Sequence, residues 1–335
     1  MCGIIGFNWE DRKLAKSMCR SISHRGPDGE GFYFDKNISL GHRRLAIIDL
    51  TEKGKQPMCN KEGTLWISYN GEIYNFKELR EELIKKGYEF KSKTDTEVIL
   101  NCYQEYGYDC VRKFNGMFAF AIWDSKKREL FLARDRIGIK PLYYYFEGEK
   151  FIFASEIKAI LKHKIPRIIN LEALNHYLRL LYVPAPLTMF KDILKFPHGS
   201  YAVFKDRKLI FKKYWILKQE DDTILKGESK GEIKEEIKRE IKALMEDSVK
   251  RMLVSDRPVG IFLSGGVDST IVTAIAKKSV SAKIKTFSVG FKTPVEEEKF
   301  NADLKLAKQT SELYNTEHHE IIVDGKMVLN NIKEV

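Results

Sequence analysis

The chain has 335 residues, of which 43% are hydrophobic and 12% aromatic, and it carries a net charge of +11. This length and composition predict a globular protein of two domains and exclude a disordered chain. The lysines are spread along the chain among glutamates, so we interpret the charge as a solvated surface and expect no nucleic-acid partner.

Signals for a membrane or for secretion are absent from the sequence. It has no run of about 18 apolar residues. Its start has no basic segment followed by an apolar stretch, so we expect no membrane association and a cytoplasmic location. The five cysteines lack Cys-x-x-Cys spacing, which argues against a disulfide framework or a zinc site.

Cys2 combines two chemical groups that catalysis needs. Removal of Met1 would leave Cys2 with a free α-amine beside its thiol. That amine has a reference pKa of roughly 8, so one residue supplies a nucleophile together with its general base. Because N-terminal residues activate thiols and hydroxyls in this way, the sequence predicts nucleophilic catalysis at Cys2.

The first half of the chain predicts antiparallel sheets packed with helices. Helices are predicted over Phe76–Lys86 and Thr94–Tyr106, the second opened by a capping box of Thr94 and Glu97. Segments rich in β-branched and aromatic residues predict strands over Ile4–Asn8, Ser39–Ile47, Leu65–Tyr69, Phe118–Trp123, Glu129–Ala133, Leu142–Phe146 and Phe151–Ala154.

The second half predicts a different architecture. After a polar linker, Ser229 and Glu232 form a capping box that opens an amphipathic helix. The elements that follow alternate between strand and helix, which is typical of a parallel, doubly wound sheet. The predicted strands and helices are, in chain order, Val259–Leu263, Ser269–Lys278, Ile284–Phe291, Phe300–Tyr314 and His319–Val323.

A glycine-containing loop joins the first of these strands to the helix after it. The loop reads Ser264-Gly265-Gly266-Val267-Asp268-Ser269. Glycines permit close backbone approach, and the N-terminus of the helix offers free N–H groups to a phosphate. The loop is not a Walker A motif. It resembles the PP-loop of ATP pyrophosphatases, which split ATP into AMP and pyrophosphate.

Five further motifs accompany Cys2 in the first half of the chain. They are Ser23–Gly29, Gly41–Asp49, Tyr69–Asn75, Ser92–Glu97 and Arg134–Tyr144. These segments resemble those of class II glutamine amidotransferases. Together with the PP-loop downstream, they make the chain similar to the family of glutamine-hydrolysing asparagine synthetases from Met1 to about Val323.

The resemblance implies a role for each residue of the glutaminase site. Cys2 attacks the side-chain amide of glutamine, and Asn70 and Gly71 form the oxyanion hole. Arg44 pairs with the α-carboxylate of glutamine, while Glu72 and Asp95 accept hydrogen bonds from its α-ammonium. The implied glutamine-binding residues are Arg44, Leu45, Ala46, Ile47, Ile48, Asn70, Gly71, Glu72 and Asp95.

The resemblance also implies an ATP site in the second half. In this family the β-carboxylate of aspartate is activated as an adenylate, which ammonia attacks, so the implied cofactors are ATP and Mg²⁺. Leu263 and Val289 flank the adenosine, and Asp268 holds the metal. The implied ATP-binding residues are Leu263, Ser264, Gly265, Gly266, Asp268, Ser269 and Val289.

The histidines near these motifs are interpreted as structural. His24 and His42 could suggest a Cys–His pair, but the amine of Cys2 already supplies a base. His318 and His319 are adjacent on a predicted strand, so their side chains point to opposite faces and cannot share a metal.

We expect an α+β N-terminal-nucleophile (Ntn) glutaminase domain of stacked antiparallel sheets over residues 1–205 and a linker over residues 206–230. Residues 231–335 are expected to form a partial α/β PP-loop domain similar to adenine nucleotide α-hydrolases. Family members continue through a Ser-Gly-Glu-Gly-x-Asp-Glu motif that this sequence lacks. Three strands and two helices would leave apolar sheet surface exposed.

Three interpretations stay open at this point. The first is an enzyme of the asparagine synthetase type, either a fragment of a longer product or half of a split one, with a second chain supplying the missing segment or as a homodimer. Alternatively, the chain is a glutaminase that supplies ammonia to another activated acid. A third alternative is a non-catalytic protein that binds glutamine or a nucleotide.

Overall fold

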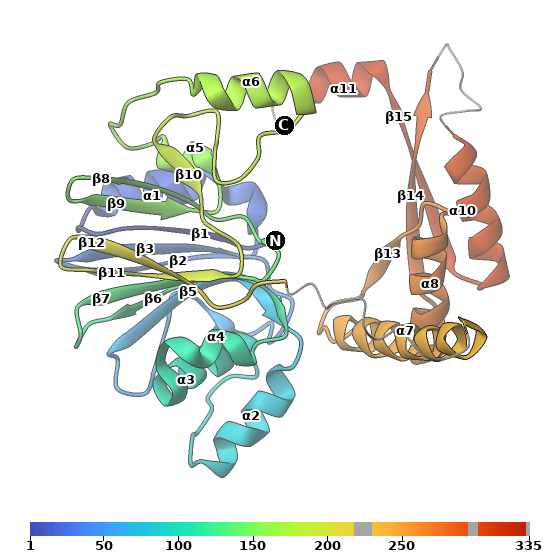
Figure 1. Ribbon diagram of the computed structural model, residues 1–335, viewed down its shortest axis with the longest axis horizontal. Helices are drawn as coiled ribbons and strands as arrows, with labels where there is room; N and C mark the ends of the chain where they lie inside the picture. The colour runs from blue at the N-terminus through green and yellow to red at the C-terminus, as the bar shows by residue number, and fades with distance from the viewer. Residues whose placement is uncertain (218–229, 294–300, 333–335) are drawn as a thin grey trace. The chain divides into compact units, whose positions relative to one another are not determined.

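The computed structural model describes residues 1–217, 230–293 and 301–332. The chain divides into two compact units, Met1–Gln219 and Glu220–Val335 (Figure 1).

The first unit contains two six-stranded antiparallel sheets within residues 1–217. The first sheet, in spatial order, consists of β10 (Ile193–Lys195), β8 (Tyr143–Glu147), β9 (Lys150–Ala154), β1 (Gly3–Phe7), β3 (Ile38–Arg44) and β2 (Gly29–Asp35). The second consists of β12 (Lys208–Lys213), β11 (Ser200–Lys205), β7 (Glu129–Arg134), β6 (Gly116–Asp124), β5 (Leu65–Ile73) and β4 (Met58–Cys59). Cys2 therefore directly precedes a central strand.

Helices cover both outer faces of this pair of sheets. Figure 1 shows α1 and α5 on one side and α2, α3 and α4 on the other. The helices of the first unit are α1 (Arg12–Ser21), α2 (Phe76–Lys85), α3 (Asp95–Tyr106), α4 (Cys110–Lys113), α5 (Ile157–Ile160) and α6 (Leu171–Leu180). The result is a four-layer αββα arrangement, which confirms the predicted stacking of antiparallel sheets.

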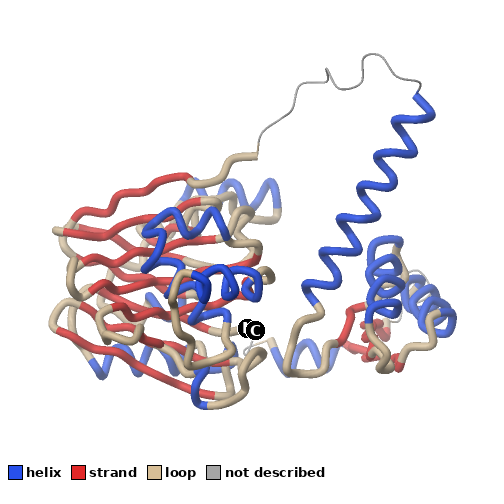
Figure 2. Tube along the Cα trace, turned by 90° about the horizontal axis from the view of Figure 1, so that it is seen from below, coloured by secondary structure: helices blue, strands red, loops and turns tan. Residues whose placement is uncertain are grey.

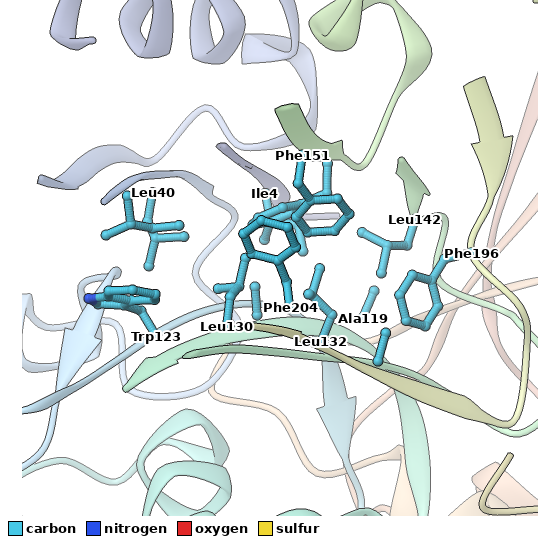
Figure 3. Close-up of a cluster of buried hydrophobic side chains, with 14 residues drawn as sticks. Ile4, Leu40, Ala119, Trp123, Leu130, Leu132, Leu142, Phe151, Phe196 and Phe204 are labelled. Carbon is cyan, nitrogen blue, oxygen red and sulfur yellow. The ribbon is translucent and has the colours of Figure 1, made fainter. Parts of the chain in front are cut away.

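The main core lies between the two sheets (Figure 3). Ile4 and Leu40 of the first sheet meet Ala119 and Leu132 of the second, and all four are fully buried. Side chains alternate along a strand, so the next residue of β1, Ile5, packs outward against α1 and α5 instead. Both faces of the first sheet are therefore apolar, which explains why its strands lack a simple polar–apolar alternation.

The second unit contains a parallel sheet of three strands among its described residues, in the order β13-β14-β15. The strands are β13 (Gly260–Phe262), β14 (Lys285–Lys292) and β15 (Glu317–Asp324), and the helices are α7 (Lys230–Met252), α8 (Val267–Ser279), α10 (Ala302–Leu313) and α11 (Gly325–Asn331). Figure 2 shows α7 as a single long helix. Val249 of α7 packs with Ile275 of α8 and with Ile284.

The parallel sheet leaves apolar side chains exposed, as expected for so few strands. Phe262, Val289 and Ile321 are exposed by 84%, 48% and 51% of their surface, respectively.

The structure contains several elements that were not predicted from the sequence, and two of them are instructive. Helix α1 was not predicted, although Asp11 caps its N-terminus and Ala15, Met18 and Cys19 are buried at helical spacing. Residues 208–213, which were placed in a linker, form β12 and pair with β11. Ser229, one half of the proposed capping box, lies outside the described residues.

Helices of the described residues are either too short or too polar to cross a membrane. The longest, α7, is rich in lysine and glutamate.

Candidate active site

Cys2 directly precedes β1, and its thiol is held by backbone groups of Leu45. The Sγ atom accepts from the Leu45 N–H at 3.4 Å and donates to the Leu45 carbonyl at 3.6 Å. Arg25 fixes the Cys2 backbone, because its Nε donates to the Cys2 carbonyl at 2.9 Å. Burial raises the pKa of the Cys2 thiol, and the N–H of Leu45 offsets this only in part. The thiol therefore needs a base to become a nucleophile.

A narrow pocket beside Cys2 collects most of the predicted glutaminase residues. Those lining it are Cys2, Arg44, Leu45, Ile47, Ile48, Gly71, Glu72 and Asp95. Two predicted residues do not line it. Ala46 is buried, with its N–H donating to Asp28 Oδ2 at 2.9 Å, and Asn70 is 1% exposed.

Asn70 carries a buried amide nitrogen that has no hydrogen-bond partner among the described residues. An unmade hydrogen bond of this kind costs about 1–3 kcal/mol. Ser68, two residues earlier on β5, donates to the Gly41 carbonyl of β3 at 3.1 Å. Side chains two residues apart on a strand share a face, so Asn70 and Glu72 also face the first sheet, in which Cys2 directly precedes β1. The unpaired donor is thus directed toward the sheet of the nucleophile.

The backbone N–H of Gly71 lies on the side of β5 that does not pair with β6. The partner of Gly71 in the ladder is Phe118, whose N–H donates to Asp135 Oδ2 at 3.1 Å and whose carbonyl accepts from the Asp135 N–H at 2.8 Å. In an antiparallel sheet, the backbone N–H and C=O of one residue point to the same side. Because those of Phe118 bond toward Asp135, they make no hydrogen bond to Gly71 on β5. The N–H of Gly71 therefore points away from β6.

The backbone N–H groups of Tyr69 and Ile73, two residues before and after Gly71 on β5, also point away from β6 and donate to side chains. The Tyr69 N–H donates to Gln56 Oε1 at 2.7 Å, and the Ile73 N–H donates to Asp95 Oδ2 at 3.0 Å. Because Gln56 and Asp95 both line the pocket, the intervening N–H of Gly71 is on the pocket side.

Arg44 is anchored on the pocket wall by backbone carbonyls. Its guanidinium donates to the Thr51 carbonyl at 2.9 Å and to the Asp49 carbonyl. A side chain at Gly54 would collide with that guanidinium, so glycine is required for its close approach. Arg44 therefore presents a positioned cation at the pocket.

Glu72 and Asp95 place two carboxyl groups in the same pocket. Burial raises the pKa of Glu72 to about 9, with the neighbouring Asp95 adding to the rise. Burial also raises the pKa of Asp95, against the hydrogen bonds that it accepts from Tyr69 Oη at 2.7 Å and from Ile73. Within the described residues, neither carboxyl has a cation within 4.0 Å. Together they form an acceptor site for a cationic ligand.

Several residues that line the pocket were not predicted from the sequence, and Gln56 is the most informative of them. Its Nε2 donates to Thr96 Oγ1 at 3.2 Å while its Oε1 accepts from the Tyr69 N–H, so it joins α3 to β5. An isolated glutamine in a loop carries no recognisable pattern. The missed residues are Gly54, Gln56, Tyr69, Thr94 and Thr96.

The four histidines considered in the sequence each have a nearby partner. His42 Nε2 lies 3.0 Å from the Tyr69 carbonyl, and burial lowers the pKa of His42 to about 4. His24 lies 2.9 Å from Glu156 Oε1. His318 and His319 have separate partners, Thr286 and Glu317, and no cluster of three potential metal ligands occurs in the described parts of the chain.

The predicted ATP loop forms the N-terminus of α8. Gly265 adopts φ +77°, and a Cβ there would come within 2.6 Å of the Ala307 nitrogen, so the turn requires glycine. Ser264 Oγ and Ser269 Oγ lie 3.1 Å apart across the turn. Asp268 is exposed in the first turn of the helix. This arrangement offers free helix N–H groups and hydroxyls to an anion.

The two predicted adenosine residues differ in exposure. Leu263 is buried, and its carbonyl accepts a 2.5 Å hydrogen bond from Ser288 Oγ. Val289, on the adjacent strand β14, is 48% exposed.

Comparison with known proteins places this site in a family. The model for the glutamine amidotransferase domain matches residues 1–215. The chain belongs to the glutamine amidotransferase family. A model for asparagine synthase matches residues 240–335.

Several curated relatives match along the whole chain. Asparagine synthetase [glutamine-hydrolyzing] 1 of Bacillus subtilis is 38% identical over 349 residues, covering 100% of this chain and 52% of the relative. Asparagine synthetase B [glutamine-hydrolyzing] of Escherichia coli is 34% identical over 359 residues, covering 100% of this chain and 56% of the relative. The chain thus spans about half the length of these relatives.

A solved structure described as an allosteric regulatory enzyme of purine biosynthesis shares the fold. It superposes with a TM-score of 0.50 at 14% identity and covers 96% of this chain and 80% of its own. The amidotransferase match and this likeness confirm the predicted Ntn fold of the first unit.

Proposed function

We propose that the chain hydrolyses glutamine at Cys2 and that the ammonia converts aspartate to asparagine with ATP, yielding glutamate, AMP and pyrophosphate. Support for the first part comes from the pocket that Cys2 shares with Arg44, Glu72 and Asp95. Support for the second part comes from the asparagine synthase match over residues 240–335 and from the names of the relatives.

Charge complementarity explains how glutamine would be oriented. Arg44 would bind the α-carboxylate, and Glu72 and Asp95 would accept from the α-ammonium. These groups fix the backbone end of the substrate, so its side-chain amide reaches Cys2. Leu45, Ile47 and Ile48 line the same pocket and would contact the aliphatic part of the substrate.

The reaction would proceed through a thioester. The α-amine of Cys2 takes the thiol proton, and Sγ attacks the amide carbon. The Asn70 amide and the Gly71 N–H stabilise the resulting oxyanion, which satisfies the buried donor of Asn70. Ammonia leaves with the proton returned by the α-ammonium. Water then hydrolyses the thioester, releasing glutamate and restoring the thiol.

The residues of the PP-loop fit a nucleotide with a divalent cation. Gly265, Gly266, Ser264 and Ser269 would hold the pyrophosphate of ATP at the N-terminus of α8, with Leu263 and Val289 beside the adenosine. Mg²⁺ commonly binds through one or two carboxylates together with substrate phosphates, and Asp268 is available for this. The cation would neutralise the charge on the phosphates.

The observation that carries the proposal is the unpaired amide nitrogen of Asn70, which faces the sheet whose strand β1 directly follows Cys2. Its test compares Asn70→Ala with Asn101→Ala, because Asn101 is also buried with an unpaired Nδ2 but belongs to α3 and not to β5. Loss of one oxyanion donor lowers kcat by about 100-fold or more. Asn70→Ala should show this loss for glutamine hydrolysis, and Asn101→Ala should not. Equal loss in both variants would contradict the role of Asn70.

A second experiment separates the two halves of the proposal. The purified chain is supplied with ATP, Mg²⁺, aspartate and ammonia, and pyrophosphate release is measured for the wild type and for Cys2→Ala. Release in both, with glutamine hydrolysis lost only in the variant, would support the proposed division of labour. Glutamine hydrolysis without any aspartate-dependent release would favour a glutaminase that supplies another activated acid.

A further inference from the structure

Lys140 is a buried cation that the chemistry proposed above does not use. It lies in the loop between β7 and β8 and is only 5% exposed. Among the described residues no carboxylate lies within 4.0 Å of its ammonium. The partner of Nζ is the thioether sulfur of Met1, at 3.3 Å. Because a thioether is a weak acceptor, this contact repays little of the cost of burying the charge.

The loop around Lys140 is built to keep this ammonium in place. Asp135 accepts the N–H of Ile139 at 2.8 Å and that of Lys140 at 2.9 Å. Arg134 Nε donates to the Lys140 carbonyl at 2.8 Å. Gly138, with φ +76°, makes the turn that these contacts close. The backbone on both sides of the lysine is therefore fixed.

Several charged groups face the amino terminus. The cations are Arg25, which follows α1, and Lys140, and the acidic groups at the amino terminus are Asp28 and the Cys2 thiol. Glu72 of β5 and Asp95 of α3 act on the Cys2 thiol, and Glu72 and Asp135 act on Lys140. Arg25 is paired with Glu156 at 3.0 Å. Lys140 has no carboxylate within 4.0 Å among the described residues; the acidic groups that interact with it are Glu72, the Cys2 thiol and Asp135.

We propose that Lys140 is a positioning residue for glutamine hydrolysis: its ammonium, which lies 3.3 Å from the Met1 sulfur, keeps the α-amine that Cys2 gains on loss of Met1 in its neutral, proton-accepting form. This inference rests on the proposed function. A neighbouring positive charge disfavours the charged form of an amine. An α-amine has a reference pKa of about 8 and would otherwise be mainly protonated at neutral pH.

The pKa of the α-amine of Met1, the amino terminus of the full chain, agrees with this role. The pKa of the Met1 α-amine is lowered by burial first, and then by the charges of Arg25 and Lys140. Burial lowers the pKa of Lys140, while Glu72 and the Cys2 thiol act in the opposite direction and favour its charged form. Because Lys140 faces Glu72 as well as the amine, the test must separate these two routes.

The test measures kcat/KM for glutamine hydrolysis against pH in the wild type, Lys140→Met and Lys140→Arg, after intact mass confirms loss of Met1. The acidic limb of such a profile reports a base of the free enzyme. In Lys140→Met this limb should move up by about one pH unit, which is about a tenfold loss on the limb, and the curves should converge at alkaline pH. Lys140→Arg should keep the wild-type limb.

A second set of variants identifies the group that responds. The same shift of the acidic limb should appear between the single variant Glu72→Gln and the double variant Glu72→Gln with Lys140→Met, because residue 72 cannot ionise in either. Loss of the shift there would overturn the inference, because Lys140 would then act through Glu72. An unmoved limb with lower activity at every pH would also overturn it and indicate a structural role.

Folding and function are controlled separately. Thermal unfolding of each variant shows whether it is folded, and Lys140→Gln replaces Lys140→Met if the latter is not. Wild-type enzyme without glutamine hydrolysis at any pH would overturn the proposed function, whereas an active wild type with an unmoved limb overturns only the role of Lys140.

Discussion

Tyr69 Oη donates to Asp95 Oδ2 at 2.7 Å, and this bond ties β5, which carries Asn70 and Gly71, to the first residue of α3. The Ile73 N–H, also on β5, donates to the same carboxylate oxygen at 3.0 Å. The strand that holds the proposed oxyanion donors thus also positions a proposed acceptor for the substrate ammonium. Strand β5 therefore positions both the proposed oxyanion hole and part of the proposed binding site for the substrate ammonium.

Tyr69→Phe tests this connection. Burial raises the pKa of Asp95 and the hydroxyl of Tyr69 holds it down, so removing the hydroxyl should raise that pKa further. A larger protonated fraction near neutral pH weakens binding of an ammonium. The KM for glutamine should rise about tenfold, as expected for a lost hydrogen bond to a charged group. Steady-state kinetics between pH 6 and 8 should show a larger rise in the KM for glutamine at the lower pH. The same KM in the wild type and in Tyr69→Phe at every pH would refute the link between Tyr69 and the ammonium site.

Arg44→Ala should impair the use of glutamine alone. Loss of a charged hydrogen bond to the substrate carboxylate is worth about 1.5–3 kcal/mol, or roughly 10- to 150-fold in KM. Pyrophosphate release with ammonia as nitrogen source should stay unchanged, because Arg44 belongs to the first unit. Arg20→Ala, an exposed arginine of α1 outside the pocket, serves as the control. Equal losses in the glutamine and ammonia reactions would rule out the carboxylate role.

Glu72→Gln should change how stability depends on pH. In the folded protein burial raises the pKa of Glu72 to about 9 from 4.5. The folded state therefore binds a proton that the unfolded state has lost between these values, and the free energy of unfolding falls as pH rises through that window. Glutamine cannot ionise, so the variant should lose less stability than the wild type between pH 5 and 9. Urea unfolding at a series of pH values measures the free energy of unfolding of both proteins. If the two curves against pH run parallel, Glu72 is not a buried neutral carboxyl in the folded protein.

Gly265→Ala should disable the nucleotide loop while sparing the glutaminase. The residue has φ +77°, and an added Cβ would meet the backbone nitrogen of Ala307 at 2.6 Å. ATP-dependent pyrophosphate release should fall at least tenfold, with glutamine hydrolysis retained. Gly325→Ala is the matched control, since a Cβ at Gly325 meets no atom within 4 Å. Similar pyrophosphate release in both variants would show that this loop is not needed for ATP.

Much of the fold follows from local patterns in the sequence. Strands β5, β6 and β7 were located because aromatic and β-branched residues favour extended backbone, and α3 because Thr94 accepts from the Glu97 N–H as a helix cap should. Helix α1 had a readable signal in Asp11 and its buried face, but its many charged residues obscured it. β12 was missed because five of its six residues are exposed and no buried face marks it as a strand.

The sequence by itself determined the chemical groups of the site, because Cys2, Arg44, Asn70 and Asp95 lie in motifs whose local spacing is recognisable. Only the tertiary structure decided which groups meet. The bond between Gln56 and Tyr69 joins a loop to a strand, and the contact between Lys140 and Met1 spans 139 positions. Such contacts depend on how two sheets stack and where their loops converge, and burial, which sets the protonation of Glu72 and Asp95, exists only in the folded chain.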